Sequence, residues 1–167
     1  MKLTNIVIEN IISSEILKSI SPTDRIHMSH DERLTIQKKD LKQGSHWKPK
    51  GFWYAFGTEW VDWVRTEMPE WEKPHLFKID IDTSRILQLN STSDIEEFTK
   101  KYGNDDESKW TNYVDWVKVS QEYGGVEMPD YSNLWSLRYE YMWLSTWDIS
   151  SGCVWDLSLI KDIEKLQ

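Results

Sequence analysis

Three short segments of this 167-residue chain carry side chains that could act together on a flat ligand with hydroxyl groups. In "RIHMSH", His27 and Ser29 are two residues apart, so on a strand both point to one face, where both can hydrogen-bond. The segment "KPKGFWYAFG" has consecutive aromatic residues at 52–54, which provide a stacking surface. In "YGGVEM", Glu127 follows a glycine turn. Hydrogen-bonding groups, a stacking surface and a carboxylate suit a nicotinamide riboside, whose glycosidic bond breaks through a cationic transition state.

The other reactive residue types do not suggest a site. His27 and His30 are three residues apart on one expected strand, so they point to opposite faces and we expect no zinc site. Asp80 and Asp82 share a strand face without further ligands nearby, which is typical of a solvated face. Cys153 has apolar neighbours, as core thiols usually do. The sequence has neither G-x-x-x-x-G-K-[ST] nor G-x-G-x-x-G, so neither a P-loop nor a Rossmann site is predicted.

The composition is that of an acidic globular protein. A net charge of −8 argues against broad nucleic-acid binding, which needs a basic face. No apolar run approaches the roughly 20 residues that span a bilayer, and the single cysteine cannot form a disulfide within the chain. We therefore predict a cytoplasmic protein without a membrane segment. Eleven tryptophans are typical of an aromatic-rich core, with a sugar-stacking surface as the alternative.

A group of lysines precedes the aromatic segment. A run of this kind is usually a solvated face, although it can also attract a small molecule that bears phosphate. The lysines of this group are Lys38, Lys39, Lys42, Lys48 and Lys50.

Hydrophobic spacing and turn residues predict short strands interspersed with single helices. The expected helices are 3–20, 31–41, 59–68, 93–102 and 110–123, and the expected strands are 25–30, 51–56, 75–82, 85–89 and 124–128. Residues 129–147 form a helix or loop, and residues 152–163 form a strand that runs into a helical turn. Thr58 is expected to cap one helix, and Ser93 with Glu96 has capping-box spacing. Several strands are too close in sequence for parallel crossovers, so we predict one α+β domain, residues 1–167, with largely antiparallel sheets.

Three segments of the chain resemble motifs of a known family. His27-Met28-Ser29 resembles the His-x-Ser/Thr of the first strand in ADP-ribosyltransferases of the diphtheria-toxin and poly(ADP-ribose) polymerase branch. Residues 51–55, "GFWYA", resemble the Gly-aliphatic-Tyr-Phe-Ala second motif of that family, and residues 151–163 resemble its closing strand. The resemblance covers residues 25–57 and 110–163, and the motifs follow the family's order.

The resemblance implies a split pair of mainly antiparallel sheets with flanking helices at residues 25–163, after an N-terminal helical segment at 1–22. His27 would bond the adenosine-side ribose and the carboxamide region of NAD, and Ser29 would orient the same end. Trp53 would replace the tyrosine that stacks on nicotinamide, which keeps the stacking and loses the hydroxyl.

The remaining roles follow from the same resemblance. Gly51 and Tyr54 would complete the wall that binds the cofactor. The family's catalytic glutamate lies at the head of a late strand, where this chain has Asp148. Glu127 lies one strand earlier, so Glu127 and Asp148 are both candidates for the catalytic acid beside His27.

The function implied is that of a mono-ADP-ribosyltransferase, which uses NAD as substrate, needs no metal and modifies a protein or nucleic-acid acceptor. The alternatives are an NAD glycohydrolase, a non-catalytic module that binds a nucleotide or sugar, and an interaction protein with tryptophan hot spots. The resemblance and the small size also suggest a toxin with an inhibitory or antitoxin partner.

Overall fold

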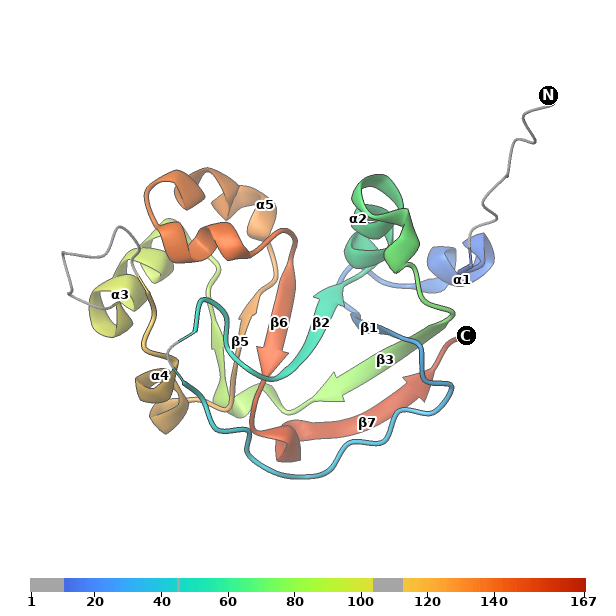
Figure 1. Cartoon of the computed structure of the whole chain (residues 1–167), viewed down its shortest axis with the longest axis horizontal. Coiled ribbons are helices and arrows are strands. Elements are labelled where there is room, and N and C mark those ends of the chain that lie inside the picture. Colours follow the sequence, from blue (N-terminus) through green and yellow to red (C-terminus); the bar gives the residue numbers. More distant parts are fainter. Residues whose placement is uncertain (1–10, 45, 104–112) are drawn as a thin grey trace.

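The computed structural model describes residues 11–44, 46–103 and 113–167 and has an α+β architecture (Figure 1). Seven strands form one curled sheet in the order β4–β5–β6–β2–β1–β3–β7. Neighbouring strands are antiparallel, except that β4 and β5 are parallel. The strands are β1 Arg25–Ser29, β2 Phe52–Phe56, β3 His75–Ile81, β4 Ile86–Gln88, β5 Gly125–Met128, β6 Ser151–Val154 and β7 Ile160–Lys165. The predicted α+β class and the largely antiparallel pairing are confirmed, whereas the strands form one sheet rather than the expected pair of sheets.

The helices form two groups beside the sheet (Figure 1). One group lies by β1, β2 and β3, and consists of α1 (Ser14–Ser19) and α2 (Glu59–Glu67). The other lies by β4, β5 and β6, and consists of α3 (Thr92–Tyr102), α4 (Trp116–Glu122) and α5 (Tyr131–Leu134). Short 3-10 turns are η1 Pro69–Trp71, η2 Thr83–Arg85, η3 Trp135–Tyr139, η4 Met142–Thr146 and η5 Leu157–Leu159. None of the helices built from the described residues has the length and apolarity that crossing a membrane requires.

The strands form where apolar residues can be buried on both faces of the sheet. Ile26 and Met28 of β1 pack with Val61 of α2. On the opposite face, Tyr54 of β2 packs with Phe77 of β3. The five strands predicted between residues 25 and 128 are confirmed, with small differences at their ends.

The predicted helix at 31–41 is wrong, because the described residues 31–41 form no helix. The backbone of this segment pairs with the C-terminal part of the chain instead. Leu41 donates from its N–H to the carbonyl of Trp155, and Lys39 accepts at its carbonyl from Leu157 N–H. Leu34, Ile36 and Leu41 pack against the core around Tyr54 and Phe77. The apolar residues of this segment therefore cover the sheet from an irregular backbone.

Two helix boundaries and the capping of α2 differ from the expected ones. Within the described residues the first helix is limited to Ser14–Ser19, and residues 3–10 of its expected range lie outside them. The helix expected at 110–123 begins at Trp116, because the side chain of Asp115 accepts from Lys118 N–H and caps it; residues 110–112 lie outside the described residues. Thr58 is at the N-cap of α2, but its hydroxyl bonds Asp62 rather than a backbone N–H.

The end of the chain adds a strand that sequence patterns did not predict. The strand and helical turn expected at 152–163 are present as β6 and η5. The chain then continues as β7, which pairs with β3 at the edge of the sheet. Exposed charged residues flank Ile163 on both sides, and charged side chains are common on edge strands.

We predict that Ser91→Ala destabilises the protein by about 1 kcal/mol, because the capping box of α3 is formed by Ser91 and Asp94 rather than by Ser93 and Glu96. Ser93 is exposed and lies inside the helix, so Ser93→Ala is the matched control and should change the free energy of unfolding little. Urea unfolding of the two variants measures the difference. Equal effects of the two substitutions would contradict the observed cap.

Candidate functional site

The sheet forks between β1 and β2. These strands pair at Arg25↔Phe56 and Ile26↔Ala55, whereas β1 pairs with β3 at four positions and β2 pairs with β6 at four. His27 comes directly after Ile26, the last residue of β1 that pairs with β2. Its Nδ1 lies 2.7 Å from the carbonyl oxygen of Trp53, and the ring centroids of His27 and Phe52 are 4.4 Å apart. One side chain thus bridges the two diverging strands.

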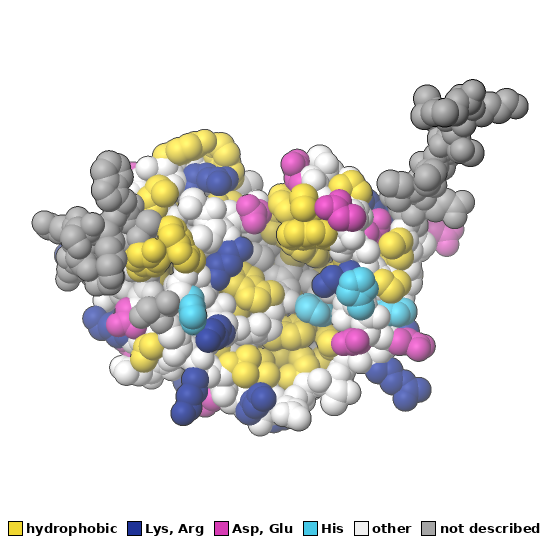
Figure 2. Space-filling view, in the orientation of Figure 1, with side chains coloured by type: hydrophobic (Ala, Val, Ile, Leu, Met, Phe, Trp, Pro, Cys, Tyr) yellow, Lys and Arg dark blue, Asp and Glu magenta, His cyan; other side chains and the backbone are white. Residues whose placement is uncertain are grey.

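A cleft of about 340 Å³ lies at this fork. Its lining includes residues 26–28 of β1 and residues 53–55 of β2. Consecutive residues of each strand take part, because the facing edges of β1 and β2 are open where the strands diverge. Trp60 of α2 borders one side, and residues 147–149 before β6 border the other. Figure 2 shows this face of the molecule hollowed between the two helical groups, with hydrophobic side chains and lysines around the hollow.

Aromatic rings form the walls of the cleft. Trp53 and Trp147 have ring centroids 4.9 Å apart and an interplanar angle of 58°. Trp60 stacks on Trp63 at 5.1 Å and 9°, and Trp63 contacts the exposed Trp71 at 6.3 Å. The cleft therefore has an indole pair on the β6 side and the end of a row of indoles on the α2 side.

Lys48 and Asp148 bring opposite charges to the cleft. The ammonium of Lys48 lies 5.3 Å from the ring centroid of Trp53, a cation–π distance. Lys48 is exposed as a residue, yet desolvation of its ammonium lowers the pKa of the group, and the carboxylate of Asp148 opposes that shift. The charge of Lys48 thus lies against apolar surface rather than free in water.

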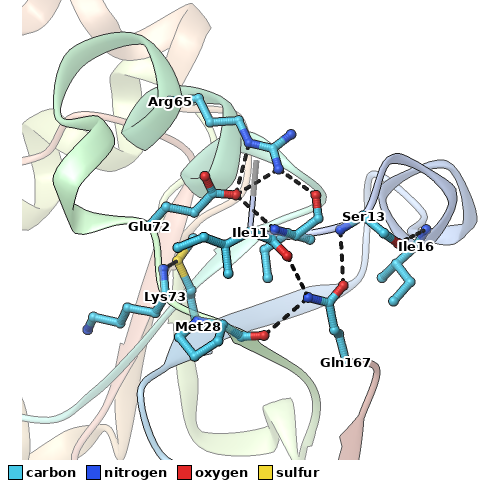
Figure 3. Close-up of polar contacts among 10 residues, drawn as sticks. Ile11, Ser13, Ile16, Met28, Arg65, Glu72, Lys73 and Gln167 are labelled. Carbon is cyan, nitrogen blue, oxygen red and sulfur yellow. Dashed lines mark hydrogen bonds and ion pairs between the residues drawn. The ribbon is translucent and has the colours of Figure 1, made fainter. Parts of the chain in front are cut away.

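Lys73 is the second cation of the lining, and a polar network fixes its position (Figure 3). The preceding residue, Glu72, is buried and accepts from Arg65 at 2.7 Å and from the N–H of Ile12 at 3.1 Å. The N–H of Lys73 lies 3.0 Å from Sδ of Met28. Figure 3 shows the side chain of Lys73 extending away from this network, which leaves its ammonium for the cleft.

His27 is a neutral imidazole with a defined tautomer. Burial lowers its pKa, the hydrogen bond to the Trp53 carbonyl opposes this, and the charge of Lys73 adds to the lowering. Because a carbonyl only accepts hydrogen bonds, Nδ1 carries the proton. Nε2 is therefore an acceptor, suited to a ligand hydroxyl.

Glu127 lies in a buried polar network on the other face of the sheet. Its carboxylate accepts from Arg25 at 2.5 and 3.1 Å, from the hydroxyl of Tyr54 at 2.6 Å and from Gln88 at 2.6 Å. Burial alone would raise the pKa of Glu127, but these hydrogen bonds and the charge of Arg25 together lower it. Glu127 is 1% exposed, so it remains an anion under a closed set of donors.

Tyr54 connects this network to the cleft. Tyr54 is part of the cleft lining, and its hydroxyl donates a hydrogen bond to Glu127. Desolvation, and after it the charge of Glu127, raises the pKa of the Tyr54 phenol. A glycine in β6 makes room for the phenol, because a Cβ on Gly152 would lie 2.5 Å from the hydroxyl oxygen. Glu127 therefore lies one hydrogen bond behind a cleft residue.

The structure gathers part of the predicted site. His27, Trp53, Tyr54 and Asp148 line the cleft, and Glu127 lies behind it.

Two further predicted residues lie outside the lining. Ser29 is buried, and its hydroxyl accepts from Asp31 N–H. Gly51 packs against β6, where a Cβ would lie 2.5 Å from Cys153 Sγ and from the carbonyl oxygen of Val154. Both residues support the strands that carry the cleft.

Sequence patterns missed Trp60, Lys73 and Trp147, since each reaches the cleft from an element outside the motifs. The one available signal was the abundance of tryptophan, which does not say which indoles share a cavity. Lys48 was recognised only as a member of a lysine group.

In the part of the chain that the structure describes, no group of three or more His, Cys, Asp or Glu side chains is arranged to hold a metal ion. Comparisons of the chain with protein-family models, with curated proteins and with solved structures found no match. The chemistry of the cleft therefore has to be argued from its own residues.

We predict that Glu127→Gln lowers the free energy of unfolding by about 3 kcal/mol, because it leaves Arg25 without its buried partner. The matched control is Glu122→Gln, which removes an exposed ion pair with Lys101 and should change the free energy of unfolding much less. Urea unfolding followed by circular dichroism compares them. Similar losses in both variants would show that the buried network contributes no more than a surface pair.

The stability contributed by Glu127 should depend on pH. A carboxyl whose pKa is lowered on folding stabilises the protein above its unfolded pKa and loses that contribution as pH falls through the folded pKa. The difference in unfolding free energy between wild type and Glu127→Gln should therefore shrink as pH falls below the ordinary value of 4.5. Denaturation curves from neutral pH downward measure it, and a difference that stays constant would contradict the shift.

Proposed function

We propose that the cleft binds NAD and that the domain transfers the ADP-ribosyl group of NAD to a macromolecular acceptor. The observation that carries this function is the presence of His27, Trp53 and Asp148, from three separate segments, in the lining of one cleft. The fork between β1 and β2 is also what a split pair of sheets would produce, which favours an ADP-ribosyltransferase-like fold.

Each part of NAD has a suitable partner in the lining. Trp53 offers a stacking surface to nicotinamide, and the buried ring of Trp147 packs against Trp53 and supports it. Nε2 of His27 can accept from a ribose hydroxyl, since Nδ1 holds the proton. Lys48 and Lys73 supply cations for the pyrophosphate. A volume of 340 Å³ is at the low end for ligand pockets, so the nicotinamide riboside half would be enclosed and the adenosine half would lie over the rim towards Trp60.

Asp148 is the acid best placed to act on the bound ribose. It is exposed in the cleft, whereas the carboxylate of Glu127 is closed off by its four donors. In the proposed reaction the bond from C1′ to the nicotinamide nitrogen breaks, and nicotinamide leaves as a neutral molecule with the electron pair. The carboxylate stabilises the positive charge that develops on the ribose. The acceptor nucleophile then bonds C1′ and loses its proton to solvent.

Glu127 has an indirect role in this mechanism. Its hydrogen bond holds the phenol of Tyr54 beneath the cleft, and its ion pair with Arg25 links β5 to β1. We therefore assign Glu127 as a positioning residue and Asp148 as the catalytic acid.

The test is incubation of the full chain with NAD labelled in the adenylate phosphate, together with cell extract. We predict labelled macromolecules and free nicotinamide from the wild type, and transfer lowered about 100-fold in Asp148→Asn, because a charge that stabilises the transition state is lost. Glu140→Gln is the matched control, since Glu140 is an exposed acid that lies, like Asp148, between α5 and β6 but outside the cleft lining, and it should keep full transfer.

Three outcomes would decide against parts of this proposal. The absence of both labelled product and free nicotinamide would reject the enzyme function. Free ADP-ribose without labelled macromolecules would assign a glycohydrolase instead. An Asp148→Asn variant as active as the wild type would reject Asp148 as the acid.

A further inference from the structure

In the ligand-free cleft, a cation already lies on the main stacking surface. The ammonium of Lys48 is 5.3 Å from the centroid of Trp53. An indole face carries partial negative charge and attracts cations more strongly than other aromatic rings do. A cationic ring can stack on this part of Trp53 only if the ammonium is displaced, because two positive charges repel each other there, whereas a neutral ring meets no such repulsion.

The surroundings of this ammonium form a site for a cation. Trp147 supplies a second indole beside Trp53, and the carboxylate of Asp148 acts electrostatically on Lys48. An aromatic face beside a carboxylate is the combination that recognises organic cations.

The backbone around Lys48 is anchored, while its side chain can move. Pro49 is buried, and Lys50 is bonded through both its N–H and its carbonyl to the side chain of Gln43. The long side chain of Lys48 can turn away without a change in this backbone. Its pKa is lowered by desolvation, so its ammonium gains hydration when it leaves the indole.

We infer that the Lys48 ammonium occupies a subsite that takes a cationic aromatic ring, so that the cleft selects the positively charged, oxidised nicotinamide over neutral rings of the same shape. This inference rests on the proposed function. It adds to that function a selectivity for cationic rings, and it identifies the Lys48 ammonium as a group of the protein itself that competes for the same place. Two positive charges cannot share one indole face at low cost, so the ring and the ammonium exclude each other. The displaced ammonium then becomes available to the ligand's phosphates at the rim.

The experiment separates charge from shape by using two small probes. 1-Methylnicotinamide is permanently cationic and nicotinamide is neutral, and neither carries phosphate. Their dissociation constants are measured by ligand-observed NMR titration with the wild type, Lys48→Met and the matched variant Lys73→Met. Methionine keeps most of the bulk of lysine. The remaining steric change affects both probes similarly, so it cancels in the ratio of the dissociation constants of nicotinamide and 1-methylnicotinamide.

The wild type should bind the cation more tightly than the neutral ring. In Lys48→Met this preference should increase about fivefold, since the competing ammonium is gone. In Lys73→Met the preference should change by less than about twofold, because Lys73 is not stacked on Trp53. Thermal unfolding of each variant verifies that it is folded.

If Lys48→Met showed an unchanged or reduced preference for the cationic probe, the inference would be overturned. It would also be overturned if the wild type bound neither of the two probes. The readout involves no turnover of NAD, so its failure is distinguishable from failure of the proposed function. Transfer of ADP-ribose with an unchanged preference would reject the internal competitor alone. A shifted preference without any transfer would keep the cation subsite and reject the enzyme.

Discussion

The carboxylate of Glu127 is the point on which the arrangement of the sheet depends. It accepts from β1 through Arg25, from β2 through Tyr54 and from β4 through Gln88, while it belongs to β5 itself. Strand β1 is the third neighbour of β5, a separation of roughly 14 Å on a flat sheet. A direct ion pair between them requires two long side chains and a sheet that curls towards this face (Figure 1). Gly152, in the strand between, leaves the space that the phenol of Tyr54 fills.

The fork between β1 and β2 then divides that curled sheet on the cleft side. Two residue pairs hold the strands together at one end, and His27 bridges them where they separate. The same residues therefore determine both the architecture and the cleft. His27 is held by the Trp53 carbonyl, and Trp53 in turn contacts Trp147 from the segment before β6. A ligand in this cleft would contact side chains whose positions are fixed by the backbone of three strands.

Local patterns predicted the strands well because each one buries apolar residues on two covered faces, as in β1 and β2. They failed at 31–41, where a helix was expected but the backbone hydrogen bonds of Lys39 and Leu41 go to residues more than a hundred positions away. No local signal contains that pairing. The capping box was misplaced by two residues, since Ser91 and Ser93 are each followed three residues later by an acid.

The candidate site was predictable to the extent that its residues lie in the strand motifs. His27, Trp53 and Tyr54 are of this kind, and Asp148 followed from its place before the closing strand. Glu127 satisfied the same sequence criteria, and only the curl of the sheet places its carboxylate among Arg25, Tyr54 and Gln88. Trp60 and Lys73 come from the segment between β2 and β3, whose fold over the cleft depends on tertiary contacts such as Glu72 with Arg65.

The separation of charges explains how an acidic protein can receive an anionic ligand. The chain has a net charge of −8, which repels phosphates at long range. Nearest the cleft, the buried charge of Glu127 is compensated by Arg25, so it adds little to the local field. Lys48 and Lys73 then outnumber Asp148 in the lining, and the local potential becomes favourable to phosphate. A neutral His27 in the same lining adds no competing charge, so under the proposed function the ribose would be recognised by hydrogen bonding and the ring by the indoles.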